Sequence, residues 1–321
     1  MPRDLAKCVV VITGASSGIG RAAGHLFADE GSRLVLAARA EGPLNDVVSE
    51  CERRGTRAVT VPTDVRDEEA VERLAQAAVD RFGRLDVWVN GAGVMAYGHF
   101  DEVPTDVFRA VIETNLLGQV HGARAALRRF RDQRSGVLIN MSSVWGRVSA
   151  PDVSAYVTSK FAVRAFSECL RQELRGEPNI DVATMLPQAV DTPIFDRAAN
   201  YSGRAARPIP PILDPEKVAE GIVACARSPK PEVTYSRAGR LIELAHATLP
   251  SLWQRFLPPA FEAGNYAETA VPKNRGSVLE PRPTPYAVYG GWHKERKREM
   301  WRALAASLRG LAGGFRRNSS P

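Results

Sequence analysis

The segment KCVVVITGASSGIG, residues 7–20, joins an apolar, β-branched run to a glycine-rich turn, and the helical pattern RAAGHLFADE follows at 21–30. The apolar run is typical of a strand that is buried on both faces. Glycines in such a turn let backbone N–H groups approach an anion at the positive end of the helix. The segment therefore predicts a dinucleotide-binding βα unit, with the pyrophosphate held by Gly14, Ser16, Ser17, Gly18, Ile19 and Gly20.

The alternation of strand and helix patterns continues to about residue 235. Strand candidates lie at 7–14, 32–39, 56–64, 84–93, 135–143, 179–187 and 231–236, and helix candidates near 18–30, 41–54, 67–82, 105–130, 154–174 and 214–227. Parallel strands need crossover helices, which then cover the sheet. We predict an α/β fold with a Rossmann-type, doubly wound parallel sheet of about seven strands and helices on both faces. This domain spans 1–240, and 241–321 forms a basic, mostly helical C-terminal extension.

The net charge of +7 is confined to the end of the chain. Residues 240–321 hold 13 Lys and Arg against 6 Asp and Glu, whereas residues 1–239 balance at 30 against 30. This distribution argues against a basic surface that wraps nucleic acid. A local basic element that contacts a membrane surface or an acidic partner stays open.

The cysteines and the N-terminus indicate the compartment. Cys8, Cys51, Cys169 and Cys225 are far apart and lack the spacing of metal ligands, so we predict free thiols and no metal site. The apolar run at 8–12 is too short for a signal peptide, and no window is long enough to span a membrane. We expect a cytoplasmic protein.

A second informative segment is SAYVTSK, residues 154–160, which places Tyr156 and Lys160 four positions apart on a predicted helix. At this spacing a phenol and an ammonium project from the same helical face. Taken alone, the pair is more simply a packed tyrosine beside a solvated lysine. Its meaning depends on the other motifs.

Five motifs occur together and in a fixed order. They are TGASSGIG at 13–20, NGAG at 90–93, Asn115 in ETNLLG, Ser143 in INMSS, and Tyr156-x3-Lys160. In this combination residues 5–240 resemble the classical short-chain dehydrogenases/reductases. The resemblance implies an oxidoreductase that transfers a hydride between a nicotinamide cofactor and a carbonyl or secondary alcohol. It also implies a homodimer or homotetramer built on the helices at 105–130 and 154–174.

The resemblance assigns catalytic roles to four side chains. Tyr156 is the acid/base, and Lys160 is expected to lower the pKa of its phenol and to bind the nicotinamide ribose. Ser143 is expected to polarise the carbonyl, with a capping serine as the simpler interpretation and Ser142 as a rival. Asn115 is expected to hold a water that links Lys160 to solvent, although from the residues alone a locally bonded amide is the simpler interpretation.

Cofactor preference depends on the end of the second strand. Ala38 stands where NAD enzymes of the family usually carry Asp, and the Arg39 that follows suits a 2′-phosphate, so we predict NADP(H) with NAD(H) less favoured. Asp64, beside Val65, resembles the residue that bonds the adenine amino group, but it could equally cap the next helix. The resemblance adds Asn90, Ala92, Gly93, Pro187, Val190 and Thr192, together with Tyr156 and Lys160, to the cofactor-binding residues. Gln188 departs from the family by replacing a glycine.

The extension has no motif. Residues 238–257 suggest an amphipathic helix interrupted at Pro250, and an irregular, proline-rich stretch follows to 286. The position of residues 241–257, after the last strand, suits a flap over the substrate entrance and favours a bulky, apolar substrate. In the main domain, Trp145 is a candidate for the pocket lining. The basic segment 292–315 is expected to pack on its own domain or on a second subunit, with peripheral membrane contact as the alternative.

Two other function classes remain beside the enzyme. One is a non-catalytic NADP-binding sensor or scaffold, and the other is a membrane-associated or nucleic-acid-binding protein that acts through its basic tail. A pure binder has no need of Asn115, Ser143, Tyr156 and Lys160 together, so the complete set favours an enzyme.

Overall fold

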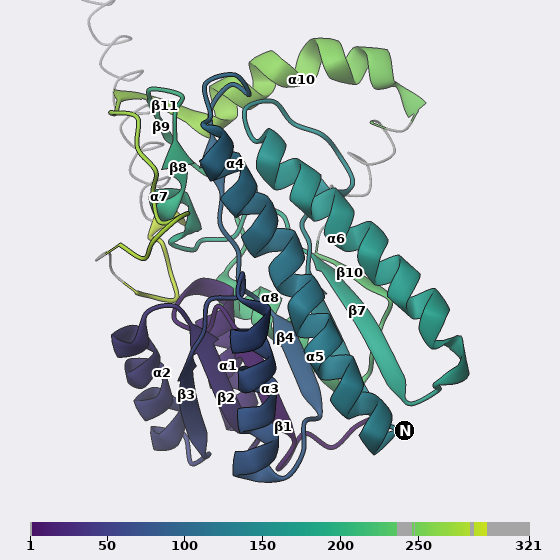
Figure 1. Ribbon diagram of the computed structural model, residues 1–321. Coiled ribbons are helices and arrows are strands. Elements are labelled where there is room, and N and C mark those ends of the chain that lie inside the picture. Colours follow the sequence, from purple (N-terminus) through teal and green to yellow (C-terminus); the bar gives the residue numbers. More distant parts are fainter. Residues whose placement is uncertain (1, 236–245, 247, 283–285, 294–321) are drawn as a thin grey trace, which may run out of the picture.

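The computed structural model describes residues 2–235, 246, 248–282 and 286–293. Its centre is a parallel sheet in the order β10-β7-β6-β4-β1-β2-β3, as Figure 1 shows in part. The strands are β1 (Val9–Thr13), β2 (Arg33–Ala38), β3 (Ala58–Pro62), β4 (Val87–Asn90), β6 (Gly136–Met141), β7 (Ile180–Leu186) and β10 (Glu232–Thr234). The chain starts in the middle of the sheet and moves outward first one way and then the other. The predicted seven-stranded, doubly wound sheet is therefore confirmed.

Helices cover both faces of the sheet (Figure 1). Successive strand residues point to opposite faces, so Val10 and Ile12 of β1 pack against one layer and Val9 and Val11 against the other. The first layer contains α1 (Gly18–Asp29), α2 (Glu41–Arg53) and α8 (Pro215–Arg227). The second contains α3 (Glu68–Phe82), α5 (Gly118–Gln133) and α6 (Ser154–Glu173), which ends in a 3-10 turn at Leu174–Gly176. Another 3-10 turn, Val144–Gly146, follows β6.

The helix predicted at 105–130 is not uniform. It consists of α4 (Thr105–Ile112), a π-helical turn over Glu113–Leu117, and α5. A π turn widens the helix by one residue, and such turns are frequent at functional sites. Asn115 lies at the centre of this turn.

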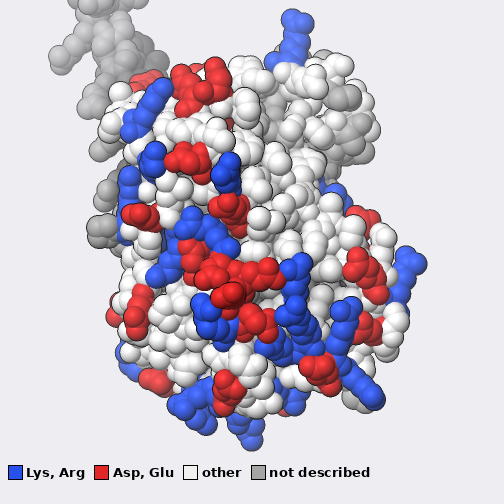
Figure 2. Space-filling view, in the orientation of Figure 1, with Lys and Arg blue, Asp and Glu red and all other residues white. Residues whose placement is uncertain are grey.

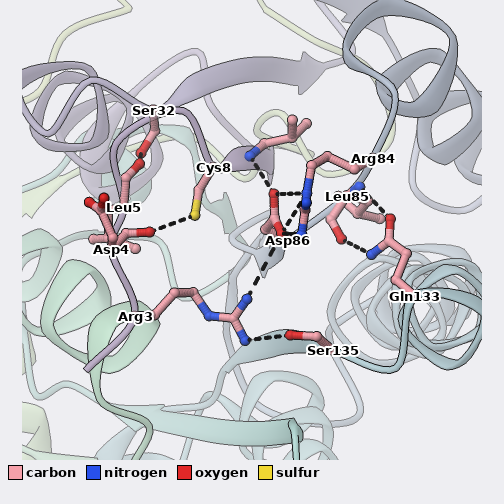
Figure 3. Close-up of polar contacts among 11 residues, drawn as sticks. Arg3, Asp4, Leu5, Cys8, Ser32, Arg84, Leu85, Asp86, Gln133 and Ser135 are labelled. Atoms are coloured by element: carbon pink, nitrogen blue, oxygen red, sulfur yellow. Dashed lines mark hydrogen bonds and ion pairs between the residues drawn. The ribbon is translucent and has the colours of Figure 1, made fainter. Parts of the chain in front are cut away.

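The amino ends of the central strands are braced by Asp86, which precedes β4 and is 2% exposed. Figure 3 shows Arg84 and Arg3 pointing toward this carboxylate. Arg84 forms an ion pair with it at 2.6 Å, and the Val9 backbone N–H donates to its Oδ2 at 2.9 Å. Gln133 exchanges two hydrogen bonds with the backbone of Leu85 and thereby ties α5 to the same edge. This brace lies at the end of the sheet opposite to the predicted site.

Small elements gather beyond the carboxyl ends of the strands. Strand β5 (Ala96–Tyr97) pairs with β8 (Ala199–Asn200), and β9 (Arg204–Ala206) pairs with β11 (Tyr266–Ala270) of the extension. Two helices, α7 (Ile194–Arg197) and α10 (Pro250–Asn265), complete this region, which lies at the top of Figure 1.

The extension departs from the sequence-based prediction in its described part. His246 and Thr248 are helical and Leu249 is not, so the helical pattern is interrupted next to Pro250, as predicted. Pro250 itself begins α10, since a proline is tolerated in the first turn, where its missing N–H is not needed. The helix then continues through Pro258 and Pro259, where an irregular stretch was predicted. Phe261, which is buried against Trp145, anchors the end of this helix, so packing outweighs propensity.

Two predictions for the tail lie outside the described residues. They concern the helix start at 238–245 and the basic segment beyond His293. In the part of the chain that the structure describes, no helix combines the length and apolar character needed to cross a bilayer.

Candidate active site

A cavity of about 350 Å³ lies at the carboxyl ends of the sheet strands. Ligands bind in this place in doubly wound folds. The lining includes most residues predicted from the sequence, namely Gly14, Ser16, Ser17, Gly18, Ile19, Gly20, Arg39, Asp64, Val65, Ala92, Gly93, Ser143, Tyr156, Lys160, Pro187, Val190 and Thr192. Asn90 and Asn115 lie behind the lining. Segments that are far apart in sequence thus form one continuous wall.

Gly14 and Gly20 of the turn have no room for a side chain. Gly14 has φ +69°, and a Cβ there would lie 2.7 Å from Ala92 Cα. A Cβ on Gly20 would lie 2.8 Å from the Gly14 carbonyl carbon, so α1 packs directly on the turn. The first turn of α1 contains no acidic residue. The Gly18 N–H donates to the Ala287 carbonyl at 2.9 Å, and the other backbone N–H groups of the first turn and the helix potential are available to an anionic diphosphate.

Arg39 lies beside this turn and is half-buried. Its Nη1 donates to the carbonyl oxygens of Val278 and Leu279 at 3.2 and 3.1 Å, and its Nη2 donates to Ser277 at 2.6 Å. Burial lowers the pKa of the Arg39 guanidinium. All three partners are neutral backbone oxygens, so no hydrogen bond to a carboxylate neutralises this cation within the described chain.

Asp64 does not cap a helix. It forms an ion pair with Arg66 at 2.6 Å, and the pKa of its carboxyl is lowered by hydrogen bonds from Arg66, which outweigh the opposing effect of burial. The cap of α3 is Asp67, whose side chain accepts from the Ala70 N–H. The alternative interpretation of Asp64 as a cap is thus wrong, and its carboxylate lines the cavity.

Ser142 and Ser143 have different roles. Ser142 Oγ donates to the Lys160 carbonyl at 2.8 Å and so ties β6 to α6. Ser143 Oγ donates to the Pro187 carbonyl at 3.2 Å and forms a hydrogen bond with Tyr156. The serine selected from the family spacing is therefore the one beside the phenol.

Tyr156 and Lys160 converge as their spacing predicts. Lys160 Nζ lies 5.4 Å from the centroid of the Tyr156 ring and donates to the Met141 carbonyl at 2.8 Å. Burial raises the pKa of Tyr156 to about 12, although the hydrogen bond with Ser143 lowers it, and burial lowers the pKa of Lys160 to about 8. The expected lowering of the phenol pKa is therefore wrong for this structure, because desolvation dominates. At neutral pH the phenol retains its proton.

The two asparagines act behind the cavity wall. Asn115 Oδ1 accepts from the Val94 N–H at 2.8 Å, and its Nδ2 donates to the Val94 carbonyl and to Ser159. The amide thus fixes the loop after β4 through partners that are far away in sequence, so the locally bonded alternative is wrong, and the expected water-holding role stays a prediction. Asn90 bonds Trp88 and Asn140. Its side chain therefore braces the neighbouring strands β4 and β6, and its contact with the cofactor stays a prediction.

The loop at 187–193 approaches the turn and lines the same cavity. Thr192 is buried, and its side chain lies 3.1 Å from the position that a Cβ on Gly18 would take. Gln188 donates from Nε2 to the Pro211 carbonyl at 2.8 Å. The side chain that replaces the usual glycine therefore holds a neighbouring loop at the cavity rim.

The far end of the cavity is apolar. Its lining includes Met95, Tyr97, Trp145, Val148, Ile194, Phe195, Ile209 and Phe261. Trp145 and Phe261 meet edge to face with centroids 5.8 Å apart. The candidate role of Trp145 is confirmed.

The extension contributes five residues to the cavity lining. Phe261 and Asn265 come from α10, and Ser277, Pro281 and Tyr286 follow later in the extension. Sequence reasoning missed these residues because nothing in the extension marks them.

The comparisons with known proteins bear directly on this geometry. The family model described as short chain dehydrogenase matches residues 8–201. The chain belongs to the short-chain dehydrogenase family. The uncharacterized oxidoreductase YxnA of Bacillus subtilis is 35% identical over 302 residues, which cover 93% of this chain and 83% of that relative.

Solved structures agree with this assignment. A short chain dehydrogenase/reductase from Burkholderia phymatum in complex with NAD has a TM-score of 0.70 at 27% identity and covers 78% of this chain and 96% of its own. An alcohol dehydrogenase from the archaeon Thermococcus sibiricus, complexed with 5-hydroxy-NADP, has a TM-score of 0.62 at 28% identity and covers 71% and 95%. The family, the fold and the fit of the glycine cradle to a diphosphate together make this chain an oxidoreductase that uses a nicotinamide cofactor.

Proposed function

We propose that this protein is an NADP(H)-dependent carbonyl reductase or alcohol dehydrogenase that acts on a bulky, apolar substrate. The observation that carries the proposal is the cluster of Ser143, Tyr156 and Lys160 on the wall of one cavity, between a dinucleotide cradle and an apolar end. No single feature of this cluster is unusual, but a binder without turnover has no use for the combination.

The proposed chemistry assigns one task to each side chain. The bound nicotinamide supplies a hydride to the substrate carbonyl, or accepts one in the reverse direction. Tyr156, whose pKa of about 12 keeps its proton in place, donates that proton as negative charge develops on the oxygen. Ser143 Oγ stabilises the same oxygen, and the ammonium of Lys160 stabilises the phenolate that remains.

Preference for NADP(H) rests on the surroundings of the second strand. Ala38 provides no carboxylate that could bind the ribose hydroxyls of NAD or repel a 2′-phosphate, and the positive charge of Arg39 faces the cavity. An arginine has five N–H donors, and the three bonds from Arg39 to backbone carbonyls leave the Nε–H and one Nη2–H for a phosphate. These features support a 2′-phosphate at this position.

We also propose a homodimer or homotetramer through the outer faces of α5 and α6. Phe161 on α6 is 39% exposed and Leu117, which precedes α5, is 42% exposed. Figure 2 shows a mostly uncharged surface over the first turns of α6 and mixed charges of both signs over α3 and α5.

A cytoplasmic location is likewise proposed, because Cys8, Cys51, Cys169 and Cys225 are all free.

The decisive experiment is oxidation of NADPH, with NADH in parallel, across small aldehydes, aryl ketones, steroids and retinoids. The wild type should turn over the larger apolar carbonyls best, and Tyr156→Phe should bind NADPH as tightly while losing turnover. Full activity in Tyr156→Phe would contradict the mechanism. Tight NADPH binding without turnover of any substrate would instead favour a sensor.

A second variant tests the cofactor preference. Arg39→Ala should weaken NADPH binding more than NADH binding. Loss of the contacts from Arg39 to the C-terminal chain affects the binding of both cofactors equally. The ratio of the two dissociation constants therefore reports the contribution of the 2′-phosphate alone. An unchanged ratio would contradict the preference for NADP(H).

A further inference from the structure

Two pieces of the extension, 276–282 and 286–293, lie along the cofactor end of the cavity rather than over the substrate entrance. Ser277, Pro281 and Tyr286 are part of the cavity lining. We refer to the two pieces together as the clasp. None of the motifs that identify the family falls within it.

The first piece is anchored on the core by backbone contacts. The Ser277 N–H donates to the Arg197 carbonyl at 2.7 Å, and Val278 is fully buried. Gly276 has φ +53° and approaches the backbone of Arg197 and Ala198 so closely that a Cβ has no room. The backbone carbonyls of residues 277–279 in this piece then accept hydrogen bonds from the Arg39 guanidinium. The first piece thus contacts Arg39, the residue expected to bind the adenosine end of the cofactor.

The second piece reaches the pyrophosphate turn itself. The Gly18 N–H, at the start of α1, donates to the Ala287 carbonyl at 2.9 Å, and Arg21 donates to the Tyr286 carbonyl. The Tyr286 ring lies 4.0 Å from the guanidinium carbon of Arg197, which donates to Ser17 Oγ at 3.0 Å. Arg197 also lines the cavity. A cation held by an aromatic ring therefore lies beside the anion cradle.

The end of the second piece is fixed to the loop at 187–193. Asp191, which is buried, accepts backbone N–H bonds from Trp292 at 2.9 Å and His293 at 3.1 Å. Trp292 Nε1 donates to the Thr192 carbonyl at 3.3 Å, and its ring meets Phe195 edge to face. The clasp thus connects the glycine turn, Arg39 and the nicotinamide-side loop.

The clasp forms a wall of the cavity and does not fill it. The residues of the cradle, of the adenosine end and of the nicotinamide-side loop all line one continuous space while the clasp is in place. Of the first-turn N–H groups of α1, that of Gly18 is taken by Ala287, whereas those of Ile19 and Gly20 have no such acceptor in the described chain. If the clasp competed with the cofactor for the site, it would fill this space instead of lining it.

We propose that the clasp and Arg197 form a further cofactor-binding element, which closes over the diphosphate and retains the dinucleotide. Arg197 supplies a positive charge to the phosphates, Tyr286 holds its guanidinium in position, and Asp191 and Trp292 keep the chain closed. The cofactor then leaves only when the clasp opens, so its release is slower than from an open cradle. This inference rests on the nicotinamide cofactor of the proposed function.

The first test uses the unmodified protein and hydrogen exchange followed by mass spectrometry. The backbone amides of Gly290, Trp292 and His293 are all hydrogen-bonded to Asp191. If the clasp closes over the cofactor, saturating NADPH should slow exchange in peptides that cover 286–293. Faster exchange in this segment on addition of NADPH would overturn the proposal, because it would mean that the cofactor displaces the chain.

The second test measures NADPH release by fluorescence after a chase with excess NADP⁺. Tyr286→Ala, which removes the ring over Arg197, should release NADPH roughly three- to thirtyfold faster, as expected for a lost cation–π contact. Trp292→Ala should act in the same direction. The matched control is Lys273→Ala, which breaks only an exposed ion pair with Glu102 at 2.9 Å just before the clasp, and should leave release unchanged.

The outcomes separate the clasp from the function. Binding of NADPH with equal release rates from wild type, Tyr286→Ala and Trp292→Ala would overturn the clasp and leave the oxidoreductase assignment intact. Failure of the wild type to bind NADPH or NADH would overturn both. Thermal unfolding of each variant, measured beside release, shows whether a faster rate comes from general loss of structure.

Discussion

Two glycines of α1, one turn apart, give a matched pair for testing the cradle. A Cβ on Gly20 would lie 2.8 Å from the Gly14 carbonyl carbon and 3.1 Å from Ala15 Cα, so the backbone of the turn must move. A Cβ on Gly24 would make ordinary contacts of 3.7 to 3.9 Å with the side chains of Leu36, Val47 and Cys51. The same substitution in the same helix should therefore have opposite effects.

The magnitudes follow from two contributions. Replacing a helical glycine by alanine stabilises a helix by about 1 kcal/mol, and this gain is common to both positions. Forcing a methyl group into a filled space costs about 1–3 kcal/mol, and this cost applies at Gly20 alone. Gly24→Ala should thus raise the midpoint of thermal unfolding by roughly 2–4 °C. Gly20→Ala should unfold below Gly24→Ala by the overpacking cost.

The assay is thermal unfolding by circular dichroism, together with the dissociation constant for NADPH. Gly20→Ala should also bind NADPH more weakly, because the turn that carries the N–H groups is displaced, whereas Gly24→Ala should bind it normally. A Gly20→Ala protein that unfolds at or above the midpoint of Gly24→Ala would refute the reasoning. So would equal NADPH affinities in the two variants.

Three further predictions concern the brace, the site and the rim. Asp86→Ala should lower the free energy of unfolding by about 1–3 kcal/mol, measured in urea, because the buried Val9 N–H loses its acceptor; cofactor affinity should not change. Lys160 is charged below its pKa of about 8 and neutral above it, so kcat/KM for carbonyl reduction should fall as pH rises through about 8; a flat profile would contradict this role. Gln188→Gly removes the bond to Pro211 and should raise KM for the substrate while leaving NADPH affinity unchanged, as steady-state kinetics will report.

The sequence predicted the central sheet well because each strand is an apolar run bounded by turn residues, and each helix has a clear period. All seven predicted runs contain a strand of the sheet, and the helix at 154–174 differs from α6 by one residue. Strands such as β5 and β8 were missed because two residues are too few to show a period. Helix α10 runs through Pro258 and Pro259, against local propensity, because tertiary contacts at Phe261 hold it.

For the candidate site, the sequence located residues but not their environment. Ser143, Tyr156 and Lys160 lie together as their motifs imply, yet the direction of the Tyr156 pKa depends on burial, which no spacing reveals. Arg197 and Tyr286 could not be paired from the sequence, since their meeting depends on the path of the extension. The same holds for Arg39, whose partners lie more than 200 residues away along the chain.

Most of the polar contacts between the clasp and the core use main-chain atoms of the clasp. The carbonyls at 277–279 and 287, and the N–H groups at 290, 292 and 293, belong to the peptide backbone and are present whatever the side chain. The amino-acid identities at these positions can therefore drift among relatives while the seal on the groove persists. What attaches a segment of this kind is the path of its main chain, so it is recognised by comparing backbones rather than letters.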